Sequence, residues 1–114
     1  MAIHPRLVAT SGTLQGQTLP IVGSEISLGR SESATYMIDH MSVSRLHCVF
    51  VSEDGAYRVR DNGSTNGTLV NGVRVDERML QHGDSVSVGD STFLFLIDED
   101  EPSLLAGNVS LTDL

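Results

Sequence analysis

The sequence contains no lysine, no tryptophan, a single cysteine and no long apolar run. Without a lysine ammonium group, a Walker-type phosphate loop and lysine-based covalent catalysis are excluded. The lone Cys48 cannot form an internal disulfide, and no apolar run approaches the roughly 20 residues that cross a bilayer. The segment "MAIHPRLVAT" has neither the basic nor the apolar region of an export signal. We therefore expect a cytoplasmic protein that does not enter a membrane.

Basic side chains are also scarce in this chain. The chain has seven arginines and 15 acidic residues, which gives a formal net charge of -8 and a pI near 4.7. Nucleic-acid binding needs basic side chains that neutralise many phosphates, so DNA and RNA are poor candidates as partners. The length of 114 residues suits one domain, which can bury roughly 65% of its unfolded surface without a disulfide or a metal.

What the sequence does contain is a series of short apolar runs rich in β-branched residues. Gly, Asn, Asp and Ser separate these runs and are the residues that tight turns require. No stretch before Asp98 has a sustained 3.6-residue period with helix caps. The pattern predicts an all-β domain, a sandwich or barrel of about ten strands. The runs occupy residues 6–10, 17–22, 25–30, 35–39, 47–51, 56–61, 68–72, 73–77, 84–90 and 91–98.

The composition changes near residue 98, where four consecutive carboxylates and a proline begin the final segment. We expect residues 1–97 to form the folded domain and residues 98–114 to form an acidic, flexible tail or linker toward a further domain. Without the five acids of this tail, the formal charge of the domain is about -3. A tail that binds a partner is the less favoured alternative.

Catalysis and metal binding are poorly supported by the side chains present. A Ser-His-Asp catalytic triad could be formed by Ser44 and His47, with Asp39 or Asp61 as the orienting acid. However, the sequence has no G-x-S-x-G nucleophile elbow. The predicted strand that begins at His47 directs its side chain toward neighbouring loops rather than onto Ser44. No Cys or His pair has metal-ligand spacing, and "DNGSTNG" lacks the acids of a calcium loop. We expect no enzyme activity, no metal and no cofactor.

Donors for an oxyanion are better represented. Arg30 follows Gly29 at the end of a predicted strand, where its guanidinium can project from a rim. Farther along lie the Ser44 hydroxyl, its backbone amide and Arg45, and then Thr65 and Asn66 in a glycine-rich turn. Loops at one end of a sandwich can bring such groups together. One arginine with several neutral donors suits a phosphorylated side chain, which carries about -1.5 to -2 charges and three acceptor oxygens.

Each of these residues also has a purely structural interpretation. Asn66-Gly67 and Asn71-Gly72 are dipeptides that two-residue hairpin turns favour. Arg30 could pair with Glu32, Ser44 could cap a turn, and Thr65 could bond its own backbone. Taken singly, the structural interpretations are the stronger ones. They do not explain why the Gly-Arg, Ser-x-x-His and Ser-Thr-Asn-Gly-Thr motifs all occur in this order within one small β-domain.

Four segments together make the sequence resemble a forkhead-associated (FHA) domain, a phosphothreonine-binding β-sandwich. They are "SLGRS" (27–31), "SVSRLHCVF" (42–50), "VRDNGSTNGTLVNG" (59–72) and "LQHGDSVSVG" (80–89), and the resemblance covers roughly residues 5–97. It implies an FHA/SMAD-like sandwich of two twisted antiparallel sheets with about eleven strands. It also implies that the recognition loops lie at one end and the two chain ends lie together at the other.

The resemblance implies a role for each matched residue of the loops. Arg30 and Ser44 are similar to direct phosphate ligands, and Thr65 to an additional phosphate or loop contact. Asn66 resembles the residue that holds the backbone of the bound peptide, and Arg45 is assigned an auxiliary contact. Four further positions resemble those that build the loops, with the histidine as a strut: Gly29, His47, Gly67 and Thr68.

The resemblance also implies a function. It implies a non-catalytic signalling module that binds phosphothreonine-containing proteins, with a Ser/Thr kinase or its substrate as partner, within a longer multidomain chain. Preference for phosphothreonine over phosphoserine is attributed in the family to a small apolar niche for the threonine methyl group. The alternative is a protein-protein interaction module that uses a sheet face and leaves the phosphate site unused. A minor alternative for the tail is self-inhibition, in which a phosphorylated Thr112 folds back into the domain's own site.

Overall fold

The computed structural model describes residues 4–97, which form eleven strands and no helix. Accordingly, none of these residues belongs to a helix long and apolar enough to span a membrane. The expected tail and Thr112 lie outside the described residues. The predicted all-β class is confirmed. The strands are β1 (Arg6–Ser11), β2 (Thr18–Pro20), β3 (Glu25–Gly29), β4 (Tyr36–Met37), β5 (Cys48–Glu53), β6 (Ala56–Asp61), β7 (Thr68–Val70), β8 (Val73–Val75), β9 (Glu77–Met79), β10 (Ser85–Val88) and β11 (Ser91–Leu96).

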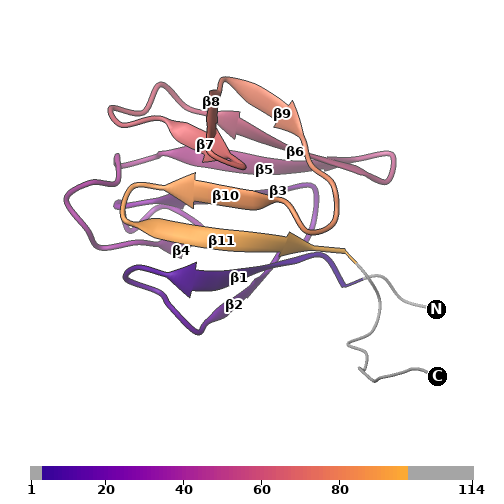
Figure 1. The fold of residues 1–114 in the computed structure, drawn as a ribbon, viewed down its shortest axis with the longest axis horizontal. Helices are drawn as coiled ribbons and strands as arrows, with labels where there is room; N and C mark the ends of the chain where they lie inside the picture. Colours follow the sequence, from indigo (N-terminus) through magenta and orange to yellow (C-terminus); the bar gives the residue numbers. More distant parts are fainter. Residues whose placement is uncertain (1–3, 98–114) are drawn as a thin grey trace.

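The strands form two sheets that pack face to face (Figure 1). One sheet has six strands in the order β2-β1-β11-β10-β7-β8, and the other has five in the order β4-β3-β5-β6-β9. All pairs are antiparallel except β3 and β4, where Leu28 lies opposite Tyr36 in a parallel pair. The expected pair of antiparallel sheets is therefore correct apart from this two-residue strand, which the chain reaches after looping back through residues 30–35.

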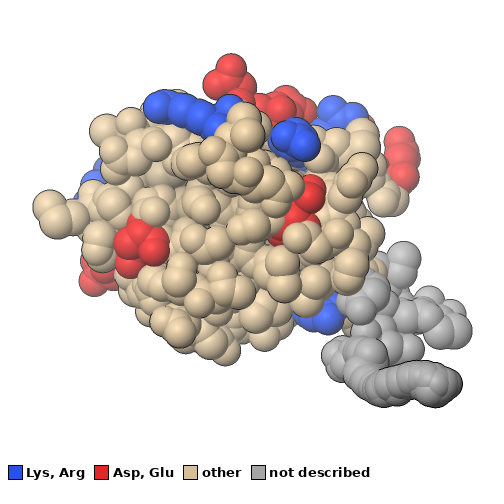
Figure 2. Space-filling model, in the orientation of Figure 1, with Lys and Arg blue, Asp and Glu red and all other residues tan. Residues whose placement is uncertain are grey.

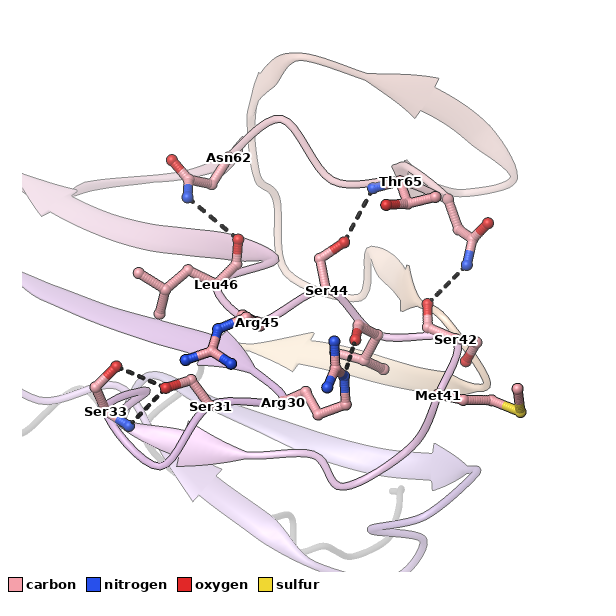
Figure 3. Close-up of a pocket in the computed structure, with 12 residues that line it drawn as sticks. Arg30, Ser31, Ser33, Met41, Ser42, Ser44, Arg45, Leu46, Asn62 and Thr65 are labelled. Carbon is pink, nitrogen blue, oxygen red and sulfur yellow. Dashed lines mark hydrogen bonds between the residues drawn. The ribbon is translucent and has the colours of Figure 1, made fainter.

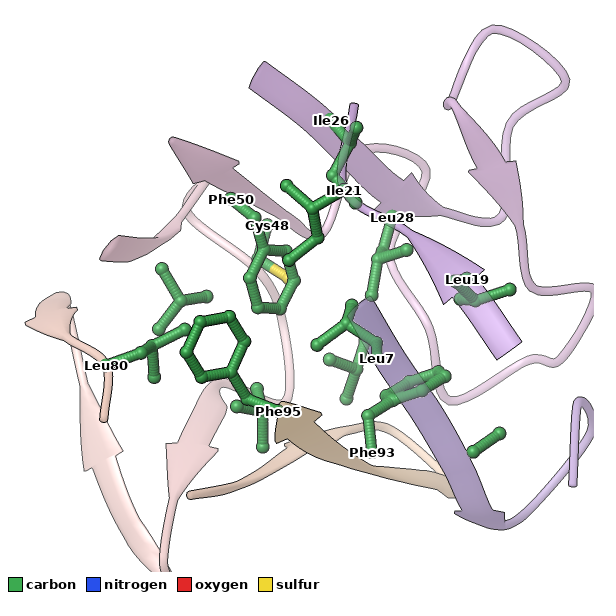
Figure 4. Packing of buried hydrophobic residues seen from close by; sticks show 14 of the residues in the cluster. Leu7, Leu19, Ile21, Ile26, Leu28, Cys48, Phe50, Leu80, Phe93 and Phe95 are labelled. Carbon is green, nitrogen blue, oxygen red and sulfur yellow. The ribbon is translucent and has the colours of Figure 1, made fainter. Parts of the chain in front are cut away.

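The core fills the space between the two sheets (Figure 4). In the longer strands, alternation sends every second side chain inward, as the burial of alternate residues along β11 shows. Three fully buried phenylalanines, Phe50, Phe93 and Phe95, are the largest of these side chains. Tyr57 packs beside Phe95 with ring centroids 5.6 Å apart. Because both sheets contribute to one core, the loops at their ends rest on a rigid base.

Eight of the ten apolar runs contain one strand along most of their length. The run at 17–22 contains the three residues of β2, and the run at 35–39 contains only the two residues of β4. The strand that the pattern does not predict separately is β9, whose three residues are all exposed. It forms because its backbone pairs with β6, where Val59 lies opposite Arg78. An edge strand with no buried side chain has no apolar alternation, so periodicity cannot reveal it.

The two Asn-Gly dipeptides that suggested hairpins behave differently. Asn71 and Gly72, with φ of 52° and 84°, form a two-residue turn that joins β7 to β8 and places Val70 opposite Val73. Asn66 and Gly67 instead end the longer connection between β6 and β7. The hairpin interpretation is therefore correct for Asn71-Gly72 and wrong for Asn66-Gly67.

The topology places three connections at one end of the sandwich. Cys48, at the start of β5, lies opposite both Leu28 of β3 and Asp61 of β6, so the loops beyond these strands meet there. At the other end Arg6 lies opposite Leu96, which brings the described ends of the chain together (Figure 1). The arrangement implied by the family resemblance is thus the observed one for residues 4–97.

Candidate functional site

The loops after β3, β4 and β6 surround an open groove of about 580 Å³ (Figure 3). All five residues predicted to bind a ligand line it: Arg30, Ser44, Arg45, Thr65 and Asn66. The other lining residues are Ser31, Ser33, Met41, Ser42, Val43, Leu46 and Asn62. No carboxylate is among the lining residues, although the chain has 15 acidic residues.

Two backbone hydrogen bonds join the end of β3 to the loop at residues 41–46. The Arg30 amide donates to the Ser44 carbonyl at 2.9 Å, and the Ser31 amide donates to the Arg45 carbonyl at 3.0 Å. The close approach requires Gly29, because a Cβ at this position would lie 2.1 Å from the Arg45 carbonyl oxygen. The Gly-Arg motif therefore has a direct steric reason: glycine lets the two segments touch, and Arg30 emerges at the contact.

The guanidinium of Arg30 is oriented by one hydrogen bond. Its Nε donates to the Val43 carbonyl at 2.9 Å, while the side chain as a whole is exposed. The ion pair with Glu32 considered from sequence is not formed, and no acidic side chain in residues 4–97 pairs with this arginine. Its two terminal nitrogens are left to bind an anion in the groove.

Ser44 and Thr65 are tied to each other across the two loops. The Thr65 amide donates to the Ser44 hydroxyl oxygen at 2.9 Å. The Ser44 amide, expected from the sequence to face an anion, donates instead to His47 Nδ1 at 3.1 Å. That expectation is wrong because the buried histidine takes the amide. The Ser44 hydroxyl accepts the Thr65 bond and keeps its own hydrogen for a ligand, and the exposed Thr65 side chain offers a second hydroxyl.

Asn66 contributes to the same loop contact. Its Nδ2 donates to the Ser42 carbonyl at 2.8 Å, so the β6–β7 connection is held against the loop at residues 41–46 (Figure 3). The Oδ1 atom and the second amide hydrogen remain for a peptide backbone. Arg45 is exposed, and none of the described residues forms a hydrogen bond with its side chain.

His47 is fully buried and contacts both the loop at residues 41–46 and the β6–β7 connection. Its Nδ1 accepts from the Ser44 amide, and its Nε2 lies 2.8 Å from the Gly67 carbonyl. Since an amide can only donate and a carbonyl can only accept, these partners assign the neutral tautomer with hydrogen on Nε2. A ring nitrogen engaged with the amide cannot take a proton from the Ser44 hydroxyl. The Ser-His-Asp arrangement is therefore not assembled.

Asp61 serves a different purpose from the orienting acid considered above. Its carboxylate accepts from the Ser64 amide at 3.0 Å, from the Ser64 hydroxyl and from the Thr68 hydroxyl at 2.7 Å. The Ser64 hydroxyl in turn accepts from the Gly67 amide at 2.9 Å. Desolvation opposes ionisation of Asp61, but the hydrogen bonds from Ser64 and Thr68 outweigh it and lower the pKa below its ordinary value.

Several residues of the site were missed by sequence reasoning. The spacing of Asp61 and Ser64 is the usual signal for an Asp side chain that bonds the backbone of its own turn, and it could have indicated this network. Ser31, Ser33 and Ser42 carry no comparable local signal, since the groove gains them only through the contact of separate loops.

Metal and thiol chemistry find no support at this site. Residues 4–97 contain no group of three or more His, Cys, Asp or Glu side chains that could hold a metal ion. The lone Cys48 is buried, and burial, with a smaller opposing contribution from Thr68, raises its pKa to about 12. At neutral pH this thiol is protonated and unreactive.

The fold and the loop geometry define an FHA domain. The family model for the FHA domain matches residues 26–89, which contain all three loops of the groove. The chain belongs to this family. The class suggested by the four sequence motifs is therefore confirmed.

Curated relatives share this region. The chain is 37% identical over 84 residues to the ABC transporter ATP-binding/permease protein Rv1747 of Mycobacterium tuberculosis, covering 74% of this chain and 9% of that protein. It is also 37% identical over 90 residues to the glycogen accumulation regulator GarA of Mycolicibacterium smegmatis, covering 79% of this chain and 57% of GarA. The chain thus spans less than two thirds of the length of either relative.

Solved structures show the same fold. A structure solved for phosphothreonine-dependent FHA domain interactions has a TM-score of 0.75 and 28% identity, covering 82% of this chain and 95% of that one. Mycobacterium tuberculosis EmbR in complex with a low-affinity phosphopeptide has a TM-score of 0.79 and 27% identity, covering 88% of this chain and 26% of EmbR.

Proposed function

We propose that this domain is a non-catalytic signalling module that binds phosphothreonine-containing peptides or proteins in the groove. The observation that carries the proposal is the chemistry of the lining: two arginines, several hydroxyls and amides, and no carboxylate, in a chain of net charge -8. Such a surface attracts an anion with several acceptor oxygens. The phosphothreonine-dependent FHA interactions and the EmbR phosphopeptide complex among the similar structures support it.

The geometry suggests how the phosphate is held. Arg30, Ser44 and Thr65 line the same groove. The two terminal nitrogens of Arg30 and the hydroxyl hydrogens of Ser44 and Thr65 make no hydrogen bond within residues 4–97. A phosphate of charge about -1.5 to -2 has three oxygens to accept from them. Asn66 would hold the backbone of the peptide and Arg45 would add an auxiliary contact. Gly29, His47, Gly67 and Thr68 would act indirectly, by fixing the loops.

Preference for phosphothreonine over phosphoserine requires an apolar niche for one methyl group. Burying that methyl is worth about 0.8 kcal/mol, with a further gain because the branched side chain loses less rotamer freedom. We therefore expect a real but finite preference. The partner is a phosphothreonine-containing protein, a Ser/Thr kinase or its substrate, in the cytoplasm. Because the chain covers only part of GarA and of Rv1747, we place the domain within a longer protein.

The experiment that tests this function is binding to an oriented phosphothreonine peptide library, with matched phosphoserine and unphosphorylated libraries. We expect phosphothreonine to be enriched. Arg30→Ala should weaken a selected peptide by about 2 kcal/mol or more in calorimetry, or about 30-fold, since a charge-assisted contact is lost. Arg60→Ala, which removes an exposed arginine of β6, is the matched control and should bind like the wild type. Unchanged affinity of Arg30→Ala would refute the site assignment.

The alternative, a module that binds through a sheet face, finds less support. Figure 2 shows the side of the six-stranded sheet, where charged side chains are few. Its outward aliphatic side chains, among them Val8, Leu69 and Leu94, are only partly exposed and alternate with threonine and serine. The most exposed large apolar side chain in the described part of the chain is Met41, which lines the groove instead. Failure of every library would favour the sheet face.

A further inference from the structure

The two backbone hydrogen bonds between β3 and the next loop align two Arg-Ser pairs. The backbone of Arg30 is hydrogen-bonded to that of Ser44, and the backbone of Ser31 to that of Arg45. Each of the two contacts therefore pairs one arginine with one serine. Each pair therefore offers one guanidinium and one hydroxyl, and both pairs line the groove. The first pair belongs to the phosphate site proposed above. In the second pair, Arg45 has so far only an auxiliary contact, and Ser31 has no assigned ligand.

The guanidinium groups of the two pairs point in different directions. In Figure 3 the Arg45 guanidinium points toward Ser31 and Ser33, whereas the Arg30 guanidinium lies on the side of Ser42. The Nε bond to Val43 holds the Arg30 guanidinium on that side, and Arg45 is the arginine directed toward Ser31 and Ser33.

The serines beside Arg45 have a hydrogen to donate. The Ser33 amide donates to the Ser31 hydroxyl oxygen at 3.1 Å, and the two hydroxyl oxygens lie 2.9 Å apart. Whichever hydroxyl donates to the other, one hydrogen of the pair remains free. Together with the unbonded Arg45 guanidinium, the cluster has several donors, and the exposed Glu32 between the two serines does not line the groove.

We infer that Arg45, Ser31 and Ser33 form a second anion-binding subsite, which takes a carboxylate or a second phosphate from the peptide that carries the phosphothreonine. The inference rests on the proposed function and deepens it, because it names the class of peptide preferred. A guanidinium and a hydroxyl suit either anion. The overall charge of -8 repels acidic peptides in general, so selectivity must come from the position of the second anion on the peptide.

The test is a glutamate scan. A phosphothreonine peptide of otherwise neutral sequence receives one glutamate at each flanking position in turn, and affinities are measured by calorimetry. On the wild-type protein we expect glutamate at one or two positions on one side of the phosphothreonine to tighten binding about three- to tenfold over alanine. Phosphoserine at the same position tests a phosphate in place of the carboxylate, and it should tighten binding more than glutamate does.

The decisive quantity is the glutamate-to-alanine affinity ratio in each variant, not the affinity itself. In Arg45→Gln the ratio should fall to about one, and in Ser33→Ala, which keeps the amide bond to Ser31, it should fall part of the way. Arg60→Gln removes the same charge from β6 and should keep the wild-type ratio.

Two results would overturn the second subsite while leaving the phosphothreonine reader intact: a flat glutamate scan, or the same ratio in Arg45→Gln as in the wild type. The latter would place Arg45 in the phosphothreonine site alone. If no phosphothreonine peptide binds better than its unphosphorylated form, the proposed function itself is refuted, and the second subsite with it.

Discussion

His47 connects the chemistry of the groove to the stability of the domain, because its two ring nitrogens satisfy one polar group from each loop. Replacing it with alanine leaves the half-buried Ser44 amide and the buried Gly67 carbonyl without these partners and opens a cavity. We expect His47→Ala to lower the free energy of unfolding by about 3 kcal/mol, measured by urea denaturation. Exposed His82 is the control, and His82→Ala should cost less than about 1 kcal/mol. Equal losses would contradict the strut assignment.

Five of the twelve residues that line the groove could be predicted from the sequence, but not which of their polar atoms remain free. Arg30, Ser44 and Thr65 were identified by residue type and motif order, and the structure brings them together. The Ser44 amide was wrongly expected to face the ligand because the sequence does not show that a histidine ring lies against it. Ser31 and Ser33 were missed for the same reason, since their place in the groove depends on contact between separate loops.

At the scale of the elements, the end of β3 is the critical contact of the site. Gly29→Ala would force a Cβ against the Arg45 carbonyl and separate both bonded pairs. We expect a loss of stability of about 2 to 3 kcal/mol, with loss of phosphopeptide binding even where the protein is still folded. Gly16→Ala provides the comparison: its φ of +91° makes alanine cost about 1 to 2 kcal/mol, but nothing lies within 4 Å. Gly16→Ala should keep binding, measured by calorimetry below the unfolding temperature.

The connection between β6 and β7 should make the domain sensitive to acid. The pKa of Asp61 is lowered in the folded state, against the cost of desolvation, by its bonds from Ser64 and Thr68. A lowered folded-state pKa contributes stability above the ordinary value of 3.8, and this contribution is lost as the pH falls below about 4. Asp61→Asn should therefore be less stable at neutral pH, and its stability should fall less between pH 5 and 2 in urea titrations.

The control for Asp61 is Asp39, an exposed acid whose side chain forms no hydrogen bond or ion pair within residues 4–97. Asp39→Asn should keep the wild-type pH dependence of stability. An equally steep acid loss in Asp61→Asn would show that the network around this carboxylate does not fix the loop.

The elements themselves were largely readable from the sequence because most of them bury alternate side chains. β5, β10 and β11 each contain this alternation, and turn residues bound each of them. β9 and the parallel pairing of β4 were not readable. A short edge strand is held by backbone pairing with its neighbour, and no side-chain pattern records that pairing.

At the scale of the whole molecule, an acidic protein presents a cationic groove, and the charge of its ligand should control binding. A phosphothreonine loses its second charge near pH 6, so the attraction to Arg30 should weaken as the pH falls through that value. We expect affinity to be highest above pH 7 and to decrease several-fold by pH 5, measured by calorimetry on one peptide without other titratable groups. Asp61 and Asp90, whose pKa values are lowered, stay ionised across this window and cannot cause the change.

His40 lies beside the groove: its Nδ1 is 2.8 Å from the Ser42 hydroxyl oxygen, and its Nε2 is 3.8 Å from the Asp90 carboxylate. Its Nδ1 also accepts from the Ser42 amide at 3.1 Å, in the loop that Asn66 contacts through the Ser42 carbonyl. The His40→Gln variant removes the imidazole beside the groove and so separates the charge of the ligand from this loop contact. If the phosphate dianion is what the groove recognises, this variant keeps the loss of affinity near pH 6. A flat profile in both proteins between pH 5 and 7.5 would contradict recognition of the dianion, and a loss that disappears in His40→Gln would assign the pH dependence to the loop.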